Sequence, residues 1–142
     1  MTRHLLDVNV VIAILDPLHV HHERAHRWFA TRGADTWHTS PTVQNGVVRV
    51  VSHAKYPNSQ PTPVVVGSLM SLVAHPGHEF VPDSVSLLDG SVQPDRLLSS
   101  GQVTDTYLLH LASSLGAQLA TFDTRLVTSA VPGGAAALLH IP

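Results

Sequence analysis

Three aspartates occupy positions at which a folded chain could bring carboxylates together. Asp7 ends the run HLLD (residues 4–7), which reads as a short buried strand, Asp123 follows the predicted strand QLATF (118–122), and Asp105 opens a predicted helix. Open α/β sheets bind ligands outside the carboxyl ends of their strands, and a helix N-terminus favours a carboxylate. Converging carboxylates raise one another's pKa unless a cation stands between them, and oxygen-only sites suit Mg²⁺ or Mn²⁺. The expected chemistry is metal-assisted hydrolysis of a phosphodiester.

Taken singly, each aspartate also has a plain structural explanation. Asp105 can cap its helix, Asp123 can serve as a turn residue, and Asp7 can terminate its strand. The combination of three, each at the end of a strand or the start of a helix, favours a common site.

A second candidate motif is the run from His22 to His26, which fits the zinc-protease pattern His-Glu-x-x-His. Such a site needs a third ligand, and the extended form would place Gly and His where this chain has Phe29 and Arg32. The only later glutamate, Glu79, falls in a predicted strand. The motif is therefore interpreted as part of an amphipathic helix, although a casual metal site at His22 and His26 remains open.

Composition predicts one folded domain spanning residues 1–142, because 44% of the residues are apolar and 13% are charged. No apolar run approaches the roughly 18 residues of a membrane helix, and the N-terminus does not resemble a signal peptide, so we expect a cytoplasmic protein with no membrane partner. The formal charge of −2 gives no overall attraction to nucleic acid. Since there are no cysteines, a metal ion would have to use oxygen or imidazole ligands.

Hydrophobic patterning alternates between strand-like and helix-like segments along the chain. Strands are predicted at 4–7, 35–39, 78–82, 118–122 and 135–141. Helices are predicted from residue 8, at 19–33 with a stop at Gly33, from Pro41 or Thr42, at 64–75, and at 103–117 with Thr104 or Asp105 as cap and Gly116 as stop. Residues 82–101 read as a connector. This order predicts an α/β fold with a mainly parallel sheet.

Four stretches together carry a family resemblance. LLDVNVVIAIL (5–15), DPLHVHHERAHRWF (16–29), TVQNGVVRVVS (42–52) and VTDTYLLHLASSLGAQLATFD (103–123) resemble a PIN-domain ribonuclease, and more narrowly a VapC-type toxin of a bacterial toxin–antitoxin pair. The resemblance implies a three-layer α/β/α fold. It also implies a Mg²⁺- or Mn²⁺-dependent endoribonuclease that cleaves structured RNA such as tRNA or rRNA, a cognate antitoxin that holds it in check, and a homodimer.

Carried over by position, the resemblance makes Asp7, Asp105 and Asp123 catalytic metal ligands, with Asn9 and Thr121 as polar neighbours that support them. The candidates for contact with the RNA phosphates are Arg49, Arg96, Arg125 and the only lysine, Lys55, each of which could equally be a solvated surface charge. Of these, Arg49 and Arg125 are selected as the substrate-binding residues.

Position 44 departs from the family pattern, in which a glutamate typically precedes the sequence NGxVRV. Gln44 keeps the size of glutamate but loses its charge, and it is expected on the apolar side of its helix beside Val47, Val48 and Val51. We predict a site that is attenuated or inactivated at this catalytic position, either by a deliberate substitution or by natural degeneration. The third explanation is a site that tolerates Gln44 because water molecules mediate its binding of the metal ion. The alternative is a crippled PIN domain that acts as an antitoxin-binding module.

Overall fold

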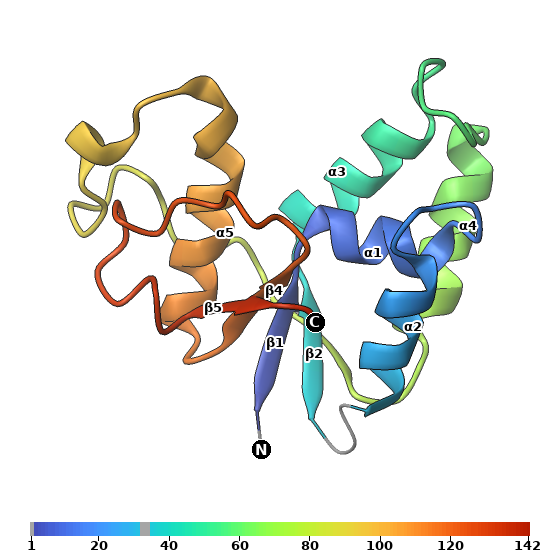
Figure 1. Ribbon diagram of the computed structural model, residues 1–142, viewed down its shortest axis with the longest axis horizontal. Helices are drawn as coiled ribbons and strands as arrows, with labels where there is room; N and C mark the ends of the chain where they lie inside the picture. Colours follow the sequence, from blue (N-terminus) through green and yellow to red (C-terminus); the bar gives the residue numbers. More distant parts are fainter. Residues whose placement is uncertain (1, 32–34) are drawn as a thin grey trace.

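The computed structural model describes residues 2–31 and 35–142, and its centre is a five-stranded parallel sheet (Figure 1). The strands are β1 (Arg3–Leu6), β2 (Thr36–Thr39), β3 (His78–Phe80), β4 (Gln118–Thr121) and β5 (Leu138–His140). They lie in the order β3-β2-β1-β4-β5, and each neighbouring pair is parallel. The mainly parallel sheet predicted from the alternating pattern is confirmed.

Helices cover the sheet on both sides. They are α1 (Val8–Leu15), α2 (His22–Thr31), α3 (Pro41–Val51), α4 (Thr62–Val73) and α5 (Val103–Ser114). In Figure 1, α1 to α4 gather on one side of the central strands and α5 lies on the other, which gives the three layers expected from the resemblance. The strand order changes direction at β1 and β4, so the carboxyl ends of these two central strands form the crevice where α/β sheets bind ligands.

The core forms where the central strands meet α1, α3 and α5. Leu5, Leu6, Trp37, Leu108 and Leu119 are completely buried. A strand that is apolar on both faces is typical of a parallel sheet covered by helices on both sides, which explains the continuous apolar run at the start of the chain.

Several element boundaries differ from the sequence predictions. Asp7 lies just beyond β1 and is the N-cap of α1, and β4 ends at Thr121, so Phe122 separates the strand from Asp123. The predicted cap of α5 was wrong, because the N-cap is Gln102 and Asp105 lies inside the first turn. The predicted stop at Gly116 is confirmed by its φ of +65°, which glycine adopts without strain. The stop predicted at Gly33 falls outside the described residues.

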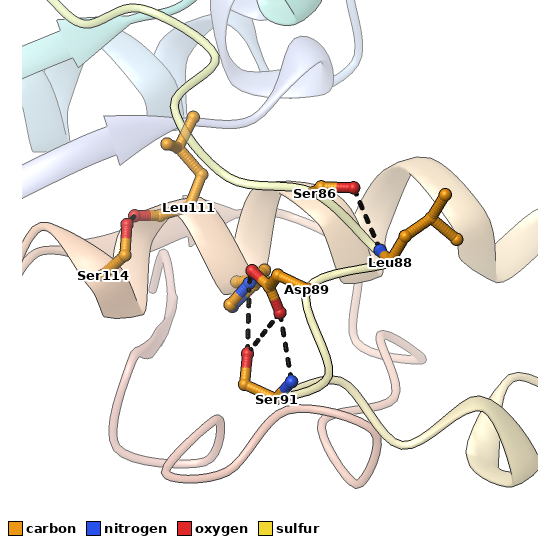
Figure 2. A network of polar contacts seen from close by, with 7 residues as sticks. Ser86, Leu88, Asp89, Ser91, Leu111 and Ser114 are labelled. Carbon is orange, nitrogen blue, oxygen red and sulfur yellow. Dashed lines mark hydrogen bonds and ion pairs between the residues drawn. The ribbon is translucent and has the colours of Figure 1, made fainter.

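The connector before α5 contains two short 3-10 helices, η1 (Pro94–Arg96) and η2 (Ser100–Gln102), and is fastened to α5 by a polar network (Figure 2). Nε2 of His110, on α5, lies 2.6 Å from Oδ2 of Asp89, and Oγ of Ser91 donates to Oδ1 of Asp89 at 2.7 Å. Hydrogen bonds from His110 and Ser91 lower the pKa of Asp89. Anchoring the connector in this way helps to hold α5, which carries Asp105, against the sheet.

In the part of the chain that the structure describes, no helix is both long and apolar enough to span a bilayer.

Candidate active site

The carboxylate of Asp7 is buried between β1, α1 and β4. Its side chain is held from both sides, because Oδ1 accepts a hydrogen bond from the Val8 backbone at 2.7 Å and Oδ2 accepts one from Thr121 Oγ1 at 2.8 Å. The residue is 5% exposed. Burial raises the pKa of Asp7, the hydrogen bonds from Thr121 and Val8 oppose that rise, and the charge of Asp123 adds to it. The result is a buried carboxylate that is held in one orientation.

Thr121 and Asn9, both expected to support the aspartates, join β4 to α1. Asn9 Nδ2 donates to Thr121 Oγ1 at 3.3 Å, while Asn9 Oδ1 accepts from the Phe122 backbone at 3.3 Å. Thr121 Oγ1 also accepts from the Asp123 backbone at 3.0 Å. This single hydroxyl therefore connects Asp7 to Asp123, which explains why a threonine at the end of β4 suits the site.

Asp105 approaches the other two aspartates from α5. Its pKa is raised to about 6, first by burial and then by the negative charges of Asp7 and Asp123. The aspartates predicted from sequence are thus brought close enough to act on one another's ionisation. Mutual repulsion of this kind is the electrostatic signature of an acidic cluster that is completed by a cation.

The donor chemistry of the cluster fits a hard divalent cation. Carboxylate oxygens are the ligands that Mg²⁺ and Mn²⁺ prefer, and Asp7 is already oriented by two donors. As they stand, no three His, Asp or Glu side chains among residues 2–31 and 35–142 are close enough together to hold an ion. Mg²⁺ usually keeps several water ligands and is held by one or two carboxylates, so a cation here would need only part of the acidic cluster.

Gln44 lies on α3, and the hydrogen bond of its side chain joins this helix to β2. Its Nε2 donates to Thr39 Oγ1, at the end of β2, at 3.0 Å, and that hydroxyl lies 2.8 Å from His78 Nε2 on β3. The predicted face of α3 was partly wrong. Val43, Gly46, Val47 and Val51 are buried, whereas Gln44 and Val48 are half-buried on the flank that faces α4.

The two arginines proposed for RNA lie on different sides of the cluster. Arg49 is exposed near the end of α3, and Arg125 is exposed in the turn after β4, where its backbone N–H donates to Asp123 Oδ1 at 2.8 Å. Sequence reasoning missed Thr42, Asn45 and Thr104. With Val8, Gly46 and Arg49 these residues line a hollow of about 390 Å³. Helical spacing could have revealed this second face of α3, since residues 42, 45, 46 and 49 recur every three or four positions.

The His-Glu-x-x-His pattern joins α2 to the end of α1. The ring of His22 donates through Nδ1 to the Ala13 carbonyl at 2.7 Å, and the ring of His26 donates through Nε2 to the Ile14 carbonyl at 2.8 Å. These carbonyls belong to the last turn of α1, which has no partners within its own helix. Both histidines therefore act as caps for α1.

Replacing His22 with alanine is expected to lower the free energy of unfolding by about 1 kcal/mol, because one helix-end carbonyl loses its donor. Urea denaturation measures the loss. Glu23→Gln is the control for the protease interpretation, since Glu23 is exposed on α2 and the substitution should alter neither stability nor RNA cleavage. Unchanged stability of His22→Ala would contradict the capping role.

Comparisons with known proteins identify the family and the fold of the chain. A family model for the PIN domain matches residues 4–131. Among curated proteins, the chain is 43% identical to ribonuclease VapC44 of Mycobacterium tuberculosis over 92% of this chain and 93% of that protein. It is 40% identical to ribonuclease VapC39 of the same species over 91% and 94%.

Two solved structures share the fold at low sequence identity. M. tuberculosis VapC20, described as a toxin that cleaves the sarcin–ricin loop, superposes with a TM-score of 0.62 at 12% identity, over 86% of this chain and 91% of that one. VapBC2 from Rickettsia felis, bound to a DNA fragment from its promoter, gives a TM-score of 0.57 at 13% identity, over 87% and 90%. With a PIN model matching most of its length and VapC ribonucleases as relatives, the chain belongs to the VapC-type ribonucleases of the PIN-domain family.

Proposed function

We propose that this protein is a Mg²⁺- or Mn²⁺-dependent endoribonuclease toxin that cleaves structured RNA, tRNA or rRNA, at Asp7, Asp105 and Asp123. The observation that carries the proposal is the gathering of three carboxylates at the carboxyl ends of β1 and β4, where burial first, and then the charges of Asp7 and Asp123, raise the pKa of Asp105 to about 6. A stable fold gains nothing from crowding like charges, whereas a cation site requires them.

Asp7 and Asp105 differ in how firmly their side chains are held. Asp7 is held by Val8 and Thr121, so it presents its remaining lone pairs in one direction. Asp105 is half-buried in the first turn of α5 and would be a second carboxylate to hold the cation. The bound metal ion would lower the pKa of a water molecule and offset the charge that develops on the phosphate. Arg49 and Arg125 supply exposed positive charge on either side of the cluster for the RNA backbone.

The attenuation predicted from Gln44 can be tested separately from the nuclease chemistry. Gln44 is hydrogen-bonded to Thr39, and glutamate at position 44 could accept a hydrogen bond from the same hydroxyl. An amide that serves this contact is compatible with an active enzyme.

The deciding experiment is cleavage of a tRNA mixture and of a sarcin–ricin-loop hairpin in Mn²⁺ and in EDTA, with this chain, Gln44→Glu and Asp105→Asn compared side by side. Metal-dependent bands from the chain as given, and none from Asp105→Asn, would support the nuclease proposal. Bands from Gln44→Glu alone would establish attenuation at position 44. Absence of cleavage by both the parent chain and Gln44→Glu would contradict the nuclease proposal and favour the crippled binding module.

An antitoxin is the proposed protein partner, and the outer face of α4 is the proposed place for it. Val64, Val66 and Met70 are 50%, 40% and 67% exposed, which is unusual for three apolar side chains on one helix. Hollows lie on both flanks of this helix. One is lined by Val48, Val66, Leu69, Met70 and Val73, together with Gln44 and Asn45, and the other includes Leu15, Pro17, Val51 and Val64. An exposed apolar helix with a hollow on each side is a surface on which an amphipathic helix of a partner could bind.

Met70→Asp is expected to weaken binding of the cognate antitoxin by at least about tenfold, because a carboxylate would be placed in an apolar contact. Leu88→Asp is the matched control, since Leu88 is 92% exposed but lies in the connector on α5. Titration calorimetry with the antitoxin measures both. Equal affinity for the two variants would place the partner elsewhere.

The homodimer implied by the family stays a prediction, which sedimentation velocity would check.

A further inference from the structure

We infer that Asn45 and Arg49 form a binding subsite for the ribose–phosphate backbone of RNA beside the three aspartates. The inference rests on the proposed nuclease function and specifies which side chains of the same site position the substrate.

The first support is the rotation of α3. At about 100° per residue, Thr42 and Gln44 point roughly 200° apart around the helix axis, whereas Thr42, Asn45 and Arg49 fall within one sector of about 60°. The contacts agree with this geometry. Thr42, Asn45 and Arg49 line the hollow that includes Val8 and Thr104, and Asn45 also borders the hollow beside α4 that Gln44 lines.

The second support is the position of that hollow relative to the aspartates. Val8 directly follows Asp7, and Thr104 directly precedes Asp105, so two of the lining residues are sequence neighbours of the acidic cluster. The hollow is bordered by α1, α3 and α5, the helices that surround the carboxyl end of β1. RNA bound at the aspartates would extend into it.

Gly46 brings α3 close enough to α1 to form this wall. A Cβ atom at position 46 would lie 2.8 Å from Val8 Cγ2, a distance that requires the side chain or the helix to move. The close packing of α3 on α1 places Asn45 and Arg49 in the same hollow as Val8, the residue that follows Asp7.

The third support is chemical. Arg49 places a guanidinium in the hollow, and across residues 2–31 and 35–142 no hydrogen bond or ion pair ties it to another side chain. Asn45 is exposed beside it and offers both a donor and an acceptor. Thr42 Oγ1 already donates a hydrogen bond to Asp83 Oδ2 at 2.8 Å, so we assign Thr42 to the wall of the hollow and not to RNA binding. A cation beside a neutral amide suits a phosphate and the polar edge of the attached nucleotide.

The test measures RNA binding independently of cleavage. Asp7→Asn is the parent for all variants, in EDTA, and fluorescence anisotropy follows a labelled sarcin–ricin-loop hairpin and a labelled tRNA across a series of salt concentrations. Arg49→Ala should weaken binding about fivefold and reduce the slope of log K against log salt by about 0.7, the value for one phosphate contact on single-stranded RNA. Asn45→Ala should weaken binding about fivefold with the slope unchanged, because it removes an uncharged hydrogen bond.

Two controls make the result specific. Arg27→Ala removes an exposed arginine from α2 and should change neither affinity nor slope, while Arg49→Lys should keep the slope of the parent. Affinities of Arg49→Ala and Asn45→Ala equal to that of Arg27→Ala would overturn the inference, as would a parent that binds neither RNA. Failure of the chain to cleave in Mn²⁺ would overturn the proposed function alone, since the binding comparison does not depend on it.

Discussion

Asp7→Asn is expected to reduce RNA cleavage by about 10²–10³-fold while leaving the protein folded. The substitution keeps the size of the side chain and an acceptor for the Val8 backbone, but it removes the buried charge that would hold a cation. Because burial raises the pKa of Asp7, the neutral amide should be at least as stable in the fold as the carboxylate at neutral pH. Single-turnover cleavage and urea denaturation of the same preparations measure the two effects.

Thr121→Val is the matched control for Asp7→Asn, because it leaves the charge and removes the hydroxyl that orients it. A loss of about 10- to 100-fold is typical when a supporting hydrogen bond to a ligand is removed. If Asp7→Asn cleaves as well as Thr121→Val, the charge of Asp7 is not the source of the activity.

Mn²⁺ at about one hundred times its dissociation constant is expected to raise the free energy of unfolding by about 2.7 kcal/mol, and Asp105→Asn should lose most of that gain. Without metal, Asp105→Asn is expected to be more stable than the parent protein at neutral and higher pH. The pKa of Asp105 is about 6 in the folded protein against an ordinary 3.8, so its contribution to stability is complete below about pH 4 and is lost as the pH rises through 6.

In EDTA at pH 8, Asp105→Asn should therefore be more stable than the parent by about 1 kcal/mol, the two-unit shift being discounted because the side chain is half exposed. At pH 4 the two proteins should unfold together. Thermal denaturation in Mn²⁺ and in EDTA at both pH values gives the comparison. Equal stabilisation of Asp105→Asn and the parent by Mn²⁺ would show that the ion binds elsewhere.

The order of strands and helices could be predicted from the chain because it depends on local patterns. Apolar runs such as the one before Asp7 can be buried only between two layers of helices, and Gly116 ends α5 because its left-handed backbone suits glycine. The positions of the three aspartates follow from the same patterns, since the ends of parallel strands share one edge of a sheet. A single sequence could therefore indicate both the α/β fold and a candidate acidic cluster.

The direction in which each polar side chain points depended on contacts between segments far apart in the chain. Periodicity could group Thr42, Asn45 and Arg49 on one face of α3, but it could not establish that Gln44 bonds to Thr39 or that Val8 and Thr104 complete a hollow beside that face. Both depend on the packing of α3 against α1, where Gly46 meets Val8. In the same way, only the approach of α2 to α1 brings His22 and His26 to helix-end carbonyls. Local hydrophobic spacing determines which elements form, whereas close packing between them determines which side chains face the site.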